Sequence, residues 1–190
     1  PSEETSVYAQ YSRALDPIGS VLTSVNDDVE LAKGEQVELG VKQQYWQGRL
    51  QTSLAVYDIV KRDLLSADPG GVQRQIGEQS SRGIEWEVYT QVSESVSLDF
   101  NLALARARYE EFVKGGDDLS GNTPRNVAEK TANLWLRWQW HPHWQLGAGL
   151  RYVGERYAND SNTSVLLSYR VVDAALHWQV SDALQISLRG

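Results

Sequence analysis

Apolar and polar residues alternate along most of the chain. The longest alternating pair of segments lies in residues 76–112, where residues 84–89 read IEWEVY and residues 96–105 read VSLDFNLALA. Because successive side chains of a strand point to opposite faces, each segment has one apolar face and one face of polar or small residues. The apolar faces run for about ten residues, roughly what a tilted strand needs to cross a bilayer. We expect two long strands joined by a tight turn at residues 91–95.

The rest of the chain repeats this unit. Further alternating segments are expected at residues 5–14, 35–45, 49–62, 128–140, 144–154, 167–180 and 183–190. Short connections near residues 47, 94, 142 and 182 alternate with long polar loops at 15–34, 63–75, 113–127 and 155–166. No segment shows a helical period, so the pattern predicts an all-β antiparallel up-and-down sheet.

Aromatic residues gather beside the short turns. A soluble sandwich has no reason to place all its short connections at one end, whereas an outer-membrane barrel has tight periplasmic turns, longer outside loops and aromatic girdles. We therefore predict a transmembrane β-barrel segment of about nine strands. Its expected lipid-facing girdle consists of Trp46, Trp138, Trp140, Trp144 and Trp178. The alternative, a soluble all-β carbohydrate-binding module, requires the last four of these tryptophans to be buried in protein.

Strand number and composition refine this picture. Bacterial barrels almost always have an even number of strands, and an open sheet in lipid leaves unpaired backbone groups at several kcal/mol each, so we expect part of a larger barrel. The net charge of −7 argues against a general nucleic-acid binder, and the lack of cysteine excludes disulfides and thiolate metal sites. Pro1 is not followed by a signal-peptide pattern and the chain contains no methionine, so it looks trimmed from something longer.

Four stretches, in order along the chain, resemble the TonB-dependent siderophore receptors of bacterial outer membranes. They are GEQSSRGIEWE at 77–87, GNTPRNVAEKTANLWL at 121–136, YVGERY at 152–157 and YRVVDA at 169–174. The resemblance implies a barrel of about 22 strands, plugged by an N-terminal globular domain, that imports ferric siderophores with energy from the TonB complex. Residues 1–190 would then be a partial barrel domain from its C-terminal half, with the plug and the last strands absent.

The resemblance also implies where a ligand would approach, which is the long-loop side. Aromatic rings and arginines there suit the planar chelating groups and negative charge of a ferric siderophore. The candidates are Tyr57, Tyr109, Arg125, Arg156, Tyr157 and Tyr169. Packing within the outer girdle and loops is the competing interpretation for each residue. A receptor of this architecture for cobalamin or a carbohydrate is the alternative function.

No catalytic constellation or cofactor motif is visible, and no serine stands in a recognisable nucleophile setting, so we expect no enzyme activity. The His141-Pro142-His143 run is interpreted as a turn and not as a metal pair. Asp117-Asp118 and Asn159-Asp160 lack the ligand spacing of a calcium loop and are expected to be solvated. His177 is expected to be a hydrogen-bonded residue of the lumen wall.

Charged residues fall on both predicted faces. The lumen face is expected to carry Glu85, Glu87, Asp99, Arg137, Arg151, Asp173 and Arg189, as structural ion pairs or against the plug. Arg106 and Arg108 instead continue the lipid-facing side of their strand, above Leu102 and Leu104. We expect these two arginines to meet lipid phosphates, including those of lipopolysaccharide, at the outer leaflet.

Overall fold

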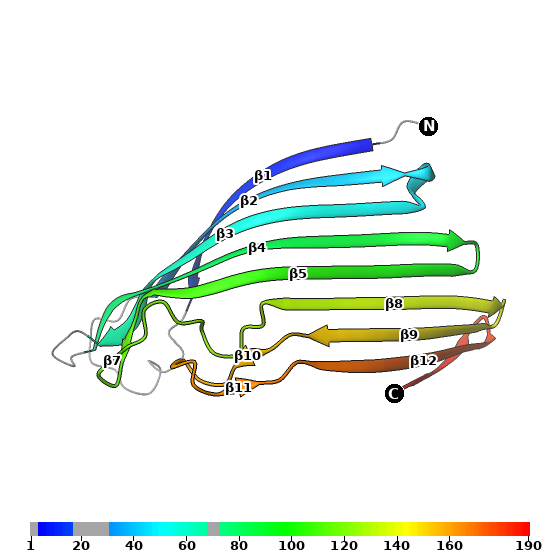
Figure 1. The fold of residues 1–190 in the computed structure, drawn as a ribbon. Helices are drawn as coiled ribbons and strands as arrows, with labels where there is room; N and C mark the ends of the chain where they lie inside the picture. The colour runs from blue at the N-terminus through cyan, green and yellow to red at the C-terminus, as the bar shows by residue number, and fades with distance from the viewer. Residues whose placement is uncertain (1–3, 17–30, 68–72) are drawn as a thin grey trace.

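The computed structural model describes residues 4–16, 31–67 and 73–190. Nine strands form one antiparallel sheet in chain order, which confirms the predicted up-and-down topology (Figure 1). They are β1 (Glu4–Asp16), β2 (Ala32–Tyr45), β3 (Leu50–Ala67), β4 (Gln73–Ser93), β5 (Val96–Glu111), β8 (Lys130–His141), β9 (Trp144–Val153), β12 (Tyr169–Ser181) and β13 (Leu184–Arg189). No helix in the described ranges is long and apolar enough to cross a membrane.

The two ends of the sheet differ as the sequence predicted. Tight connections join β2 to β3, β4 to β5, β8 to β9 and β12 to β13 at one end, on the right in Figure 1. The first of these is a single 3-10 turn, Trp46–Gly48, in which all three residues have positive φ. At the opposite end, which we call the loop end, two small hairpins form: β6 (Val113–Lys114) with β7 (Asp117–Asp118), and β10 (Arg156–Tyr157) with β11 (Val165–Leu166).

The second expected loop, residues 63–75, is shorter than predicted. β3 continues to Ala67 and β4 begins at Gln73, so strand occupies much of the stretch. The pairing passes through register shifts between Lys61 and Leu64 and between Leu64 and Leu65, with Asp63 at φ 61°. The loop was predicted from the run Asp68-Pro69-Gly70-Gly71. A bulge inserts an extra residue without ending the pairing, so both strands extend into the stretch that this run marked as a loop. Most of the first expected loop lies outside the described residues.

The register collects the apolar residues on one face of the sheet. One row across neighbouring strands consists of Leu39, Val56, Ile84 and Leu104, and the next row holds Val41, Leu54, Trp86 and Leu102. The other face carries the polar residues of the same strands, among them Glu85 beside Ala55 and Ala103.

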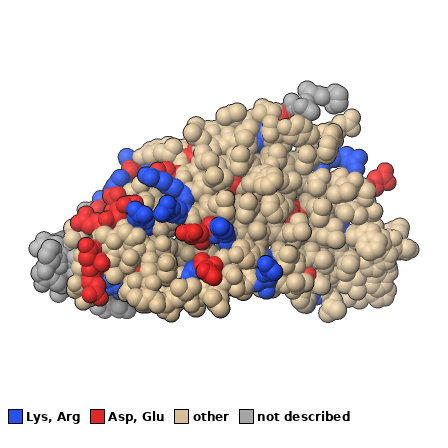
Figure 2. All heavy atoms as spheres, viewed as in Figure 1, with Lys and Arg blue, Asp and Glu red and all other residues tan. Residues whose placement is uncertain are grey.

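Both faces of this single curved layer are open, so the large apolar side chains are not packed in a core. Val37, Leu39 and Leu134 are 51%, 54% and 41% exposed. Continuous exposed apolar area of this kind marks a surface that something else covers, and a barrel wall meets lipid there. In Figure 2 the charged side chains gather toward the loop end and reach the middle of the view, and other residues cover most of the half toward the short-turn end.

Candidate functional site at the loop end

Two long connections of the loop end, residues 112–127 and 155–166, are tied together by Asp160. Its side chain is buried and sits between β10 and β11. Tyr109 donates its hydroxyl to one carboxylate oxygen at 3.0 Å, and the Lys114 ammonium lies 2.8 Å from the other. The backbone N–H of Arg125 adds a donor at 3.3 Å, and the Asn122 amide donates to the Asp160 carbonyl at 3.1 Å.

A second set of contacts strengthens this connection. The Thr123 N–H donates to the Asn162 side-chain oxygen at 2.8 Å, and the Asn162 amide donates back to the Thr123 carbonyl at 2.7 Å. Arg156 Nε donates to Asn126 Oδ1 at 2.7 Å, and the Asn126 N–H donates to the Tyr157 carbonyl at 2.7 Å. The two loops therefore form one platform, which we call the loop platform (residues 112–127 and 155–166).

The electrostatics of Asp160 follow from these donors. Burial would raise the pKa of its carboxyl, but the hydrogen bonds from Lys114, Tyr109 and the Arg125 backbone outweigh it and lower the pKa below its ordinary value. Asp160 is therefore a buried carboxylate whose two oxygens both have hydrogen-bond or ion-pair partners. This geometry replaces the predicted solvated loop at Asn159-Asp160, because the carboxylate is occupied by Lys114 and Tyr109.

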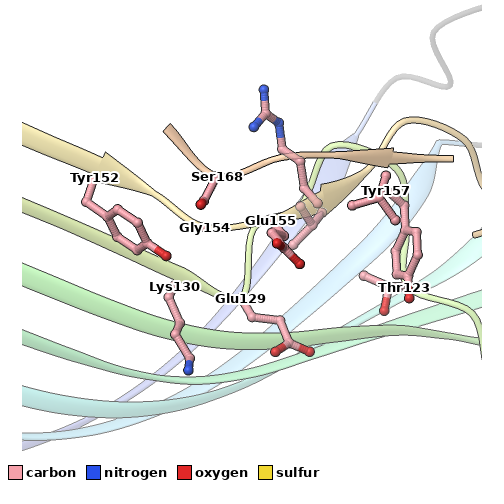
Figure 3. Close-up of a pocket in the computed structure, with 11 residues that line it drawn as sticks. Thr123, Glu129, Lys130, Tyr152, Gly154, Glu155, Tyr157 and Ser168 are labelled. Carbon is pink, nitrogen blue, oxygen red and sulfur yellow. The ribbon is translucent and has the colours of Figure 1, made fainter. Parts of the chain in front are cut away.

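A cavity of about 360 Å³ lies where the loop platform meets the starts of β8 and β12 (Figure 3). Residues at the end of the strands and residues of the loop contribute to its lining. They include Glu129, Lys130, Tyr152, Glu155, Arg156 and Tyr157. Figure 3 shows the side chains of Glu129 and Lys130 on one side of the space, with Tyr157 on the loop side. The lining thus combines two carboxylates, two cations and two phenols.

Arg156 is a cation of this cavity with capacity left for a ligand. Its guanidinium lies 5.3 Å from the centre of the Tyr169 ring, and Nε is used by Asn126. Its Nη1 is buried and has no hydrogen-bond partner in the structure. A buried donor without a partner carries a cost that an acceptor on a ligand would remove.

The structure brings three of the six predicted ligand residues together and separates the others. Arg156 and Tyr157 line the cavity, and Tyr169 lies under Arg156. Tyr109 is buried and stacks on Phe112 with ring centres 4.3 Å apart, which gives it a structural role in the platform. The Arg125 side chain is exposed nearby. Tyr57 lies on the lumen side of the sheet, against Gly83. Ligand binding by these six residues stays a prediction.

Sequence reasoning missed Lys130 and Tyr152 in the cavity and Asn162 in the platform. The first two lie where the alternation of β8 begins and that of β9 ends, so a search of the strand ends facing the loops finds them. Asn162 has a positive φ of 56°, a conformation that asparagine tolerates better than most residues. Its cross-loop partner Thr123 has no local sequence signal.

Four of the five tryptophans of the predicted girdle form a row at the short-turn end, whereas Trp46 lies in the 3-10 turn between β2 and β3 and is 68% exposed. Neighbouring ring centres are 5.8 Å apart for Trp138 and Trp140, 6.2 Å for Trp140 and Trp144, and 5.1 Å for Trp144 and Trp178. Trp138 and Trp140 are both 45% exposed. A soluble module would bury these rings, so their exposure favours the lipid-facing interpretation.

The remaining candidates have structural contacts. On the lumen face Arg137 pairs with Asp99, and His177 shares a 2.8 Å hydrogen bond with Ser187, as expected of a wall residue. His141 and His143 are exposed on either side of the predicted turn. Within the described ranges no group of three or more His, Cys, Asp and Glu side chains is placed to hold a metal ion.

The curved antiparallel sheet, its apolar outer face, its aromatic row and its loop platform define a section of an outer-membrane β-barrel wall. Residues 1–190 match the model of the family described as TonB dependent receptor-like, beta-barrel, and the chain belongs to this family. It is therefore a component of the outer membrane of a Gram-negative bacterium.

Curated relatives include receptors of known cargo. The chain is 30% identical over 173 residues to the ferrioxamine receptor of Yersinia enterocolitica, covering 90% of this chain and 24% of the relative. It is 31% identical over 180 residues to the ferrichrome outer membrane transporter/phage receptor of Escherichia coli K12, covering 92% of this chain and 23% of the relative. The chain thus spans about a quarter of the length of these curated relatives.

Solved structures show the same fold. The siderophore receptor PiuA of Acinetobacter baumannii aligns with a TM-score of 0.81 at 20% identity, over 97% of this chain and 29% of that one. The ferric preacinetobactin receptor BauA of the same species aligns with a TM-score of 0.75 at 23% identity, over 97% and 29% of the two chains.

Proposed function

We propose that the protein to which this chain belongs imports ferric siderophores across the outer membrane in a TonB-dependent manner. The observation that carries the proposal is the match over nine-tenths of the chain to a receptor named for ferrioxamine, with a receptor named for ferrichrome at similar identity. The cavity at the loop end supports it, since Arg156 and Tyr169 offer positive charge and an aromatic face on the side from which a ligand arrives.

This chain supplies part of the wall and part of the outer loops of that receptor. Residues 1–190 are one part of a larger barrel domain, whose remaining strands close the sheet and whose lumen holds a plug. The TonB complex acts through the plug, so contacts with TonB lie outside this chain. The lumen face described here, with Glu85, Glu87 and Arg151 among its charges, is the surface that the plug meets.

The receptor binds its cargo and lets it pass without making or breaking covalent bonds, so the protein is not an enzyme. Family members are receptors and transporters, as the names of the relatives state. The apolar outer face contacts membrane lipid, and Arg106 and Arg108 above it are suited to the phosphates of lipopolysaccharide.

The test is uptake of radiolabelled iron by cells that lack other siderophore receptors and express the intact protein. We expect uptake from ferric ferrioxamine or ferrichrome that disappears when tonB is deleted. Arg156→Gln, which removes the cation above Tyr169, should raise the concentration for half-maximal uptake about tenfold. The matched control Lys42→Gln removes an exposed cation of the lumen face, far from the cavity, and should leave the concentration for half-maximal uptake unchanged. Uptake of labelled cobalamin in place of iron, or iron uptake that persists without tonB, would contradict the proposal.

A further inference from the structure

All three histidines of the chain gather at one corner of the sheet, at the short-turn end. His141 ends β8, and Pro142 and His143 form the turn to β9. The rings of His141 and His143 have their centres 5.6 Å apart. His177 lies on β12, the strand that pairs with β9 (Figure 1). The cavity of the loop end lies at the opposite end of the strands, so the proposed cargo binding does not account for this group of imidazoles.

The strand register places His143 and His177 at one small cavity. His177 is paired with Gln145, and the backbone N–H of Gln179 donates to the His143 carbonyl at 2.8 Å. His143 and His177 are therefore diagonal neighbours, a Cα separation of about 7–8 Å that long side chains bridge. Both line a cavity of about 190 Å³, and His141 does not.

The ring nitrogens of these two histidines are open to a ligand. His177 Nδ1 shares a 2.8 Å hydrogen bond with Ser187 Oγ, and Gln185 Nε2 lies 3.5 Å from the same nitrogen. Among the described residues no group bonds His177 Nε2 or either ring nitrogen of His143. A hydrogen bond to one ring nitrogen fixes the imidazole and leaves the other to coordinate a metal ion, which is how metal-binding histidines are commonly held.

The other polar side chains of the cavity are neutral amides. Gln139 donates its Nε2 to the Pro142 carbonyl at 3.3 Å, and Gln179 donates its Nε2 to the Ser181 carbonyl at 2.7 Å. With these nitrogens engaged, the side-chain oxygens of the two amides remain acceptors for a cation. Of the described residues that line the cavity, none is a lysine or arginine, so the lining itself sets no positive charge against a metal ion.

We propose that this cavity binds a divalent transition-metal ion such as Zn²⁺, with His143 and His177 as its protein ligands. Imidazole nitrogen suits Zn²⁺, Cu²⁺ and Ni²⁺, whereas Mg²⁺ and Ca²⁺ prefer sets of oxygen ligands. An amide oxygen of Gln179 and water complete the coordination, and Ser187 acts as a positioning residue for His177. Two imidazoles form a smaller set than the groups of three that the described ranges lack. The site ties the β8–β9 turn to β12 and does not depend on the cargo.

The test uses the intact receptor, purified in detergent and freed of metal with a chelator, and Zn²⁺ as the probe. The readout is the rate at which diethyl pyrocarbonate modifies each histidine, resolved by tandem mass spectrometry. Zn²⁺ at about ten times its dissociation constant leaves roughly a tenth of the sites empty, so the modification of His143 and His177 should slow about tenfold. His141, in the same turn, should react as before.

This readout decides the proposal on the unmodified protein. Equal rates with and without Zn²⁺ at His143 and His177 would overturn it. Protection of His141 and His143 that leaves His177 reactive would also overturn it, since the ligands would then be the two histidines of the turn and not a pair across strands.

Variants test the geometry. His177→Gln should abolish the protection of His143, and Ser187→Ala should raise the Zn²⁺ concentration for half-protection about tenfold, because the His177 ring loses the bond that orients it. The matched control His141→Gln removes an imidazole outside the cavity and should leave the protection unchanged. A loss of protection in His141→Gln as large as in His177→Gln would contradict the cross-strand site. Siderophore uptake is measured separately, so failure of the cargo proposal leaves this result interpretable.

Discussion

At the scale of single residues, Asp160 shows how far sequence reasoning reaches. The sequence marks Asn159-Asp160 as a polar loop, and the loop is there. Its buried carboxylate depends on Lys114, 46 residues away, and on Tyr109, 51 residues away. No local pattern signals such a pair, because neither partner is defined until the sheet has placed the ends of β5 and β9 on the two sides of β8. Residue type and the long-loop side made Arg156 and Tyr169 candidates, and their ligand binding stays a prediction, whereas their stacking needed the structure.

The pKa of Asp160 makes the loop platform sensitive to acid. A carboxyl whose pKa is lower in the folded state than the ordinary value near 3.8 stabilises the fold above that value and loses the contribution as pH falls through the folded pKa. We expect a spin label at the exposed position Ser161 to become mobile below about pH 3.8. In Asp160→Asn the label should be mobile already at neutral pH, since the ion pair with Lys114 is gone.

The control for this measurement is Asp118→Asn, an exposed carboxylate on β7 that accepts the Ser120 N–H at 2.9 Å. It should leave the mobility of the label and its acid transition unchanged. If Asp160→Asn showed the same acid-induced change in label mobility as the unmodified receptor, the change would come from a titratable group other than Asp160.

At the scale of strands, alternation predicts which residues form strands and which face each side chain takes, because one face must be apolar for lipid. It does not predict that a strand continues past a bulge. β3 continues to Ala67, although its pairing with β4 shifts register beside Asp63. Neither does it predict the close packing of rings on the lumen face. There the Trp135 ring lies flat across Gly147 and Gly149 of the next strand, and an added Cβ would come within 2.6 Å and 2.4 Å of it.

This packing predicts that Gly149→Ala destabilises the wall. The new methyl group displaces the Trp135 ring, which we expect to lower the free energy of unfolding by about 1–3 kcal/mol. Urea unfolding of the intact receptor in lipid vesicles measures the change. In a Trp135→Leu background the same substitution should cost much less, because the ring that it meets is absent.

Gly34→Ala serves as the strand control, since its added Cβ would meet only the Ala14 carbonyl at 3.7 Å, an ordinary contact. Equal losses from Gly149→Ala with and without the Trp135 ring would show that the clash is not the cause.

At the scale of the whole molecule, the sheet has one apolar face suited to lipid, one polar face, and two edges, β1 and β13, that pair on one side only. The apolar side chains of the outer face are exposed because their packing partner is the bilayer. This property was predictable from the sequence, since ten-residue alternation and asymmetric turn lengths arise together in a membrane wall. The row of charges on the outer face required the register, because Asp58, Arg82 and Arg106 are far apart in sequence.

Lipids brominated along their acyl chains should quench the tryptophan fluorescence of the intact receptor. Trp86, Trp138 and Trp178 are 42%, 45% and 38% exposed on the outer face, where bromine atoms reach them. Replacing Trp135, which lies on the lumen face, should leave the quenched fraction nearly unchanged or raise it. Tryptophan fluorescence that brominated lipid does not quench would show that the outer face packs against protein and not against lipid.

The row of indoles at the short-turn end has an optical consequence. Trp144 on β9 and Trp178 on β12 are parallel within 3°, while Trp138 and Trp140 are tilted by 53° to each other. Rings this close pass excitation energy among themselves, and each transfer between tilted rings rotates the plane of the emitted light. The assembled wall should therefore emit depolarised fluorescence when excited in the middle of the indole band, and recover polarisation at its red edge. An unassembled chain, in which the indoles are far apart, would not show this difference. The dependence of the polarisation on excitation wavelength therefore reports whether the wall has assembled.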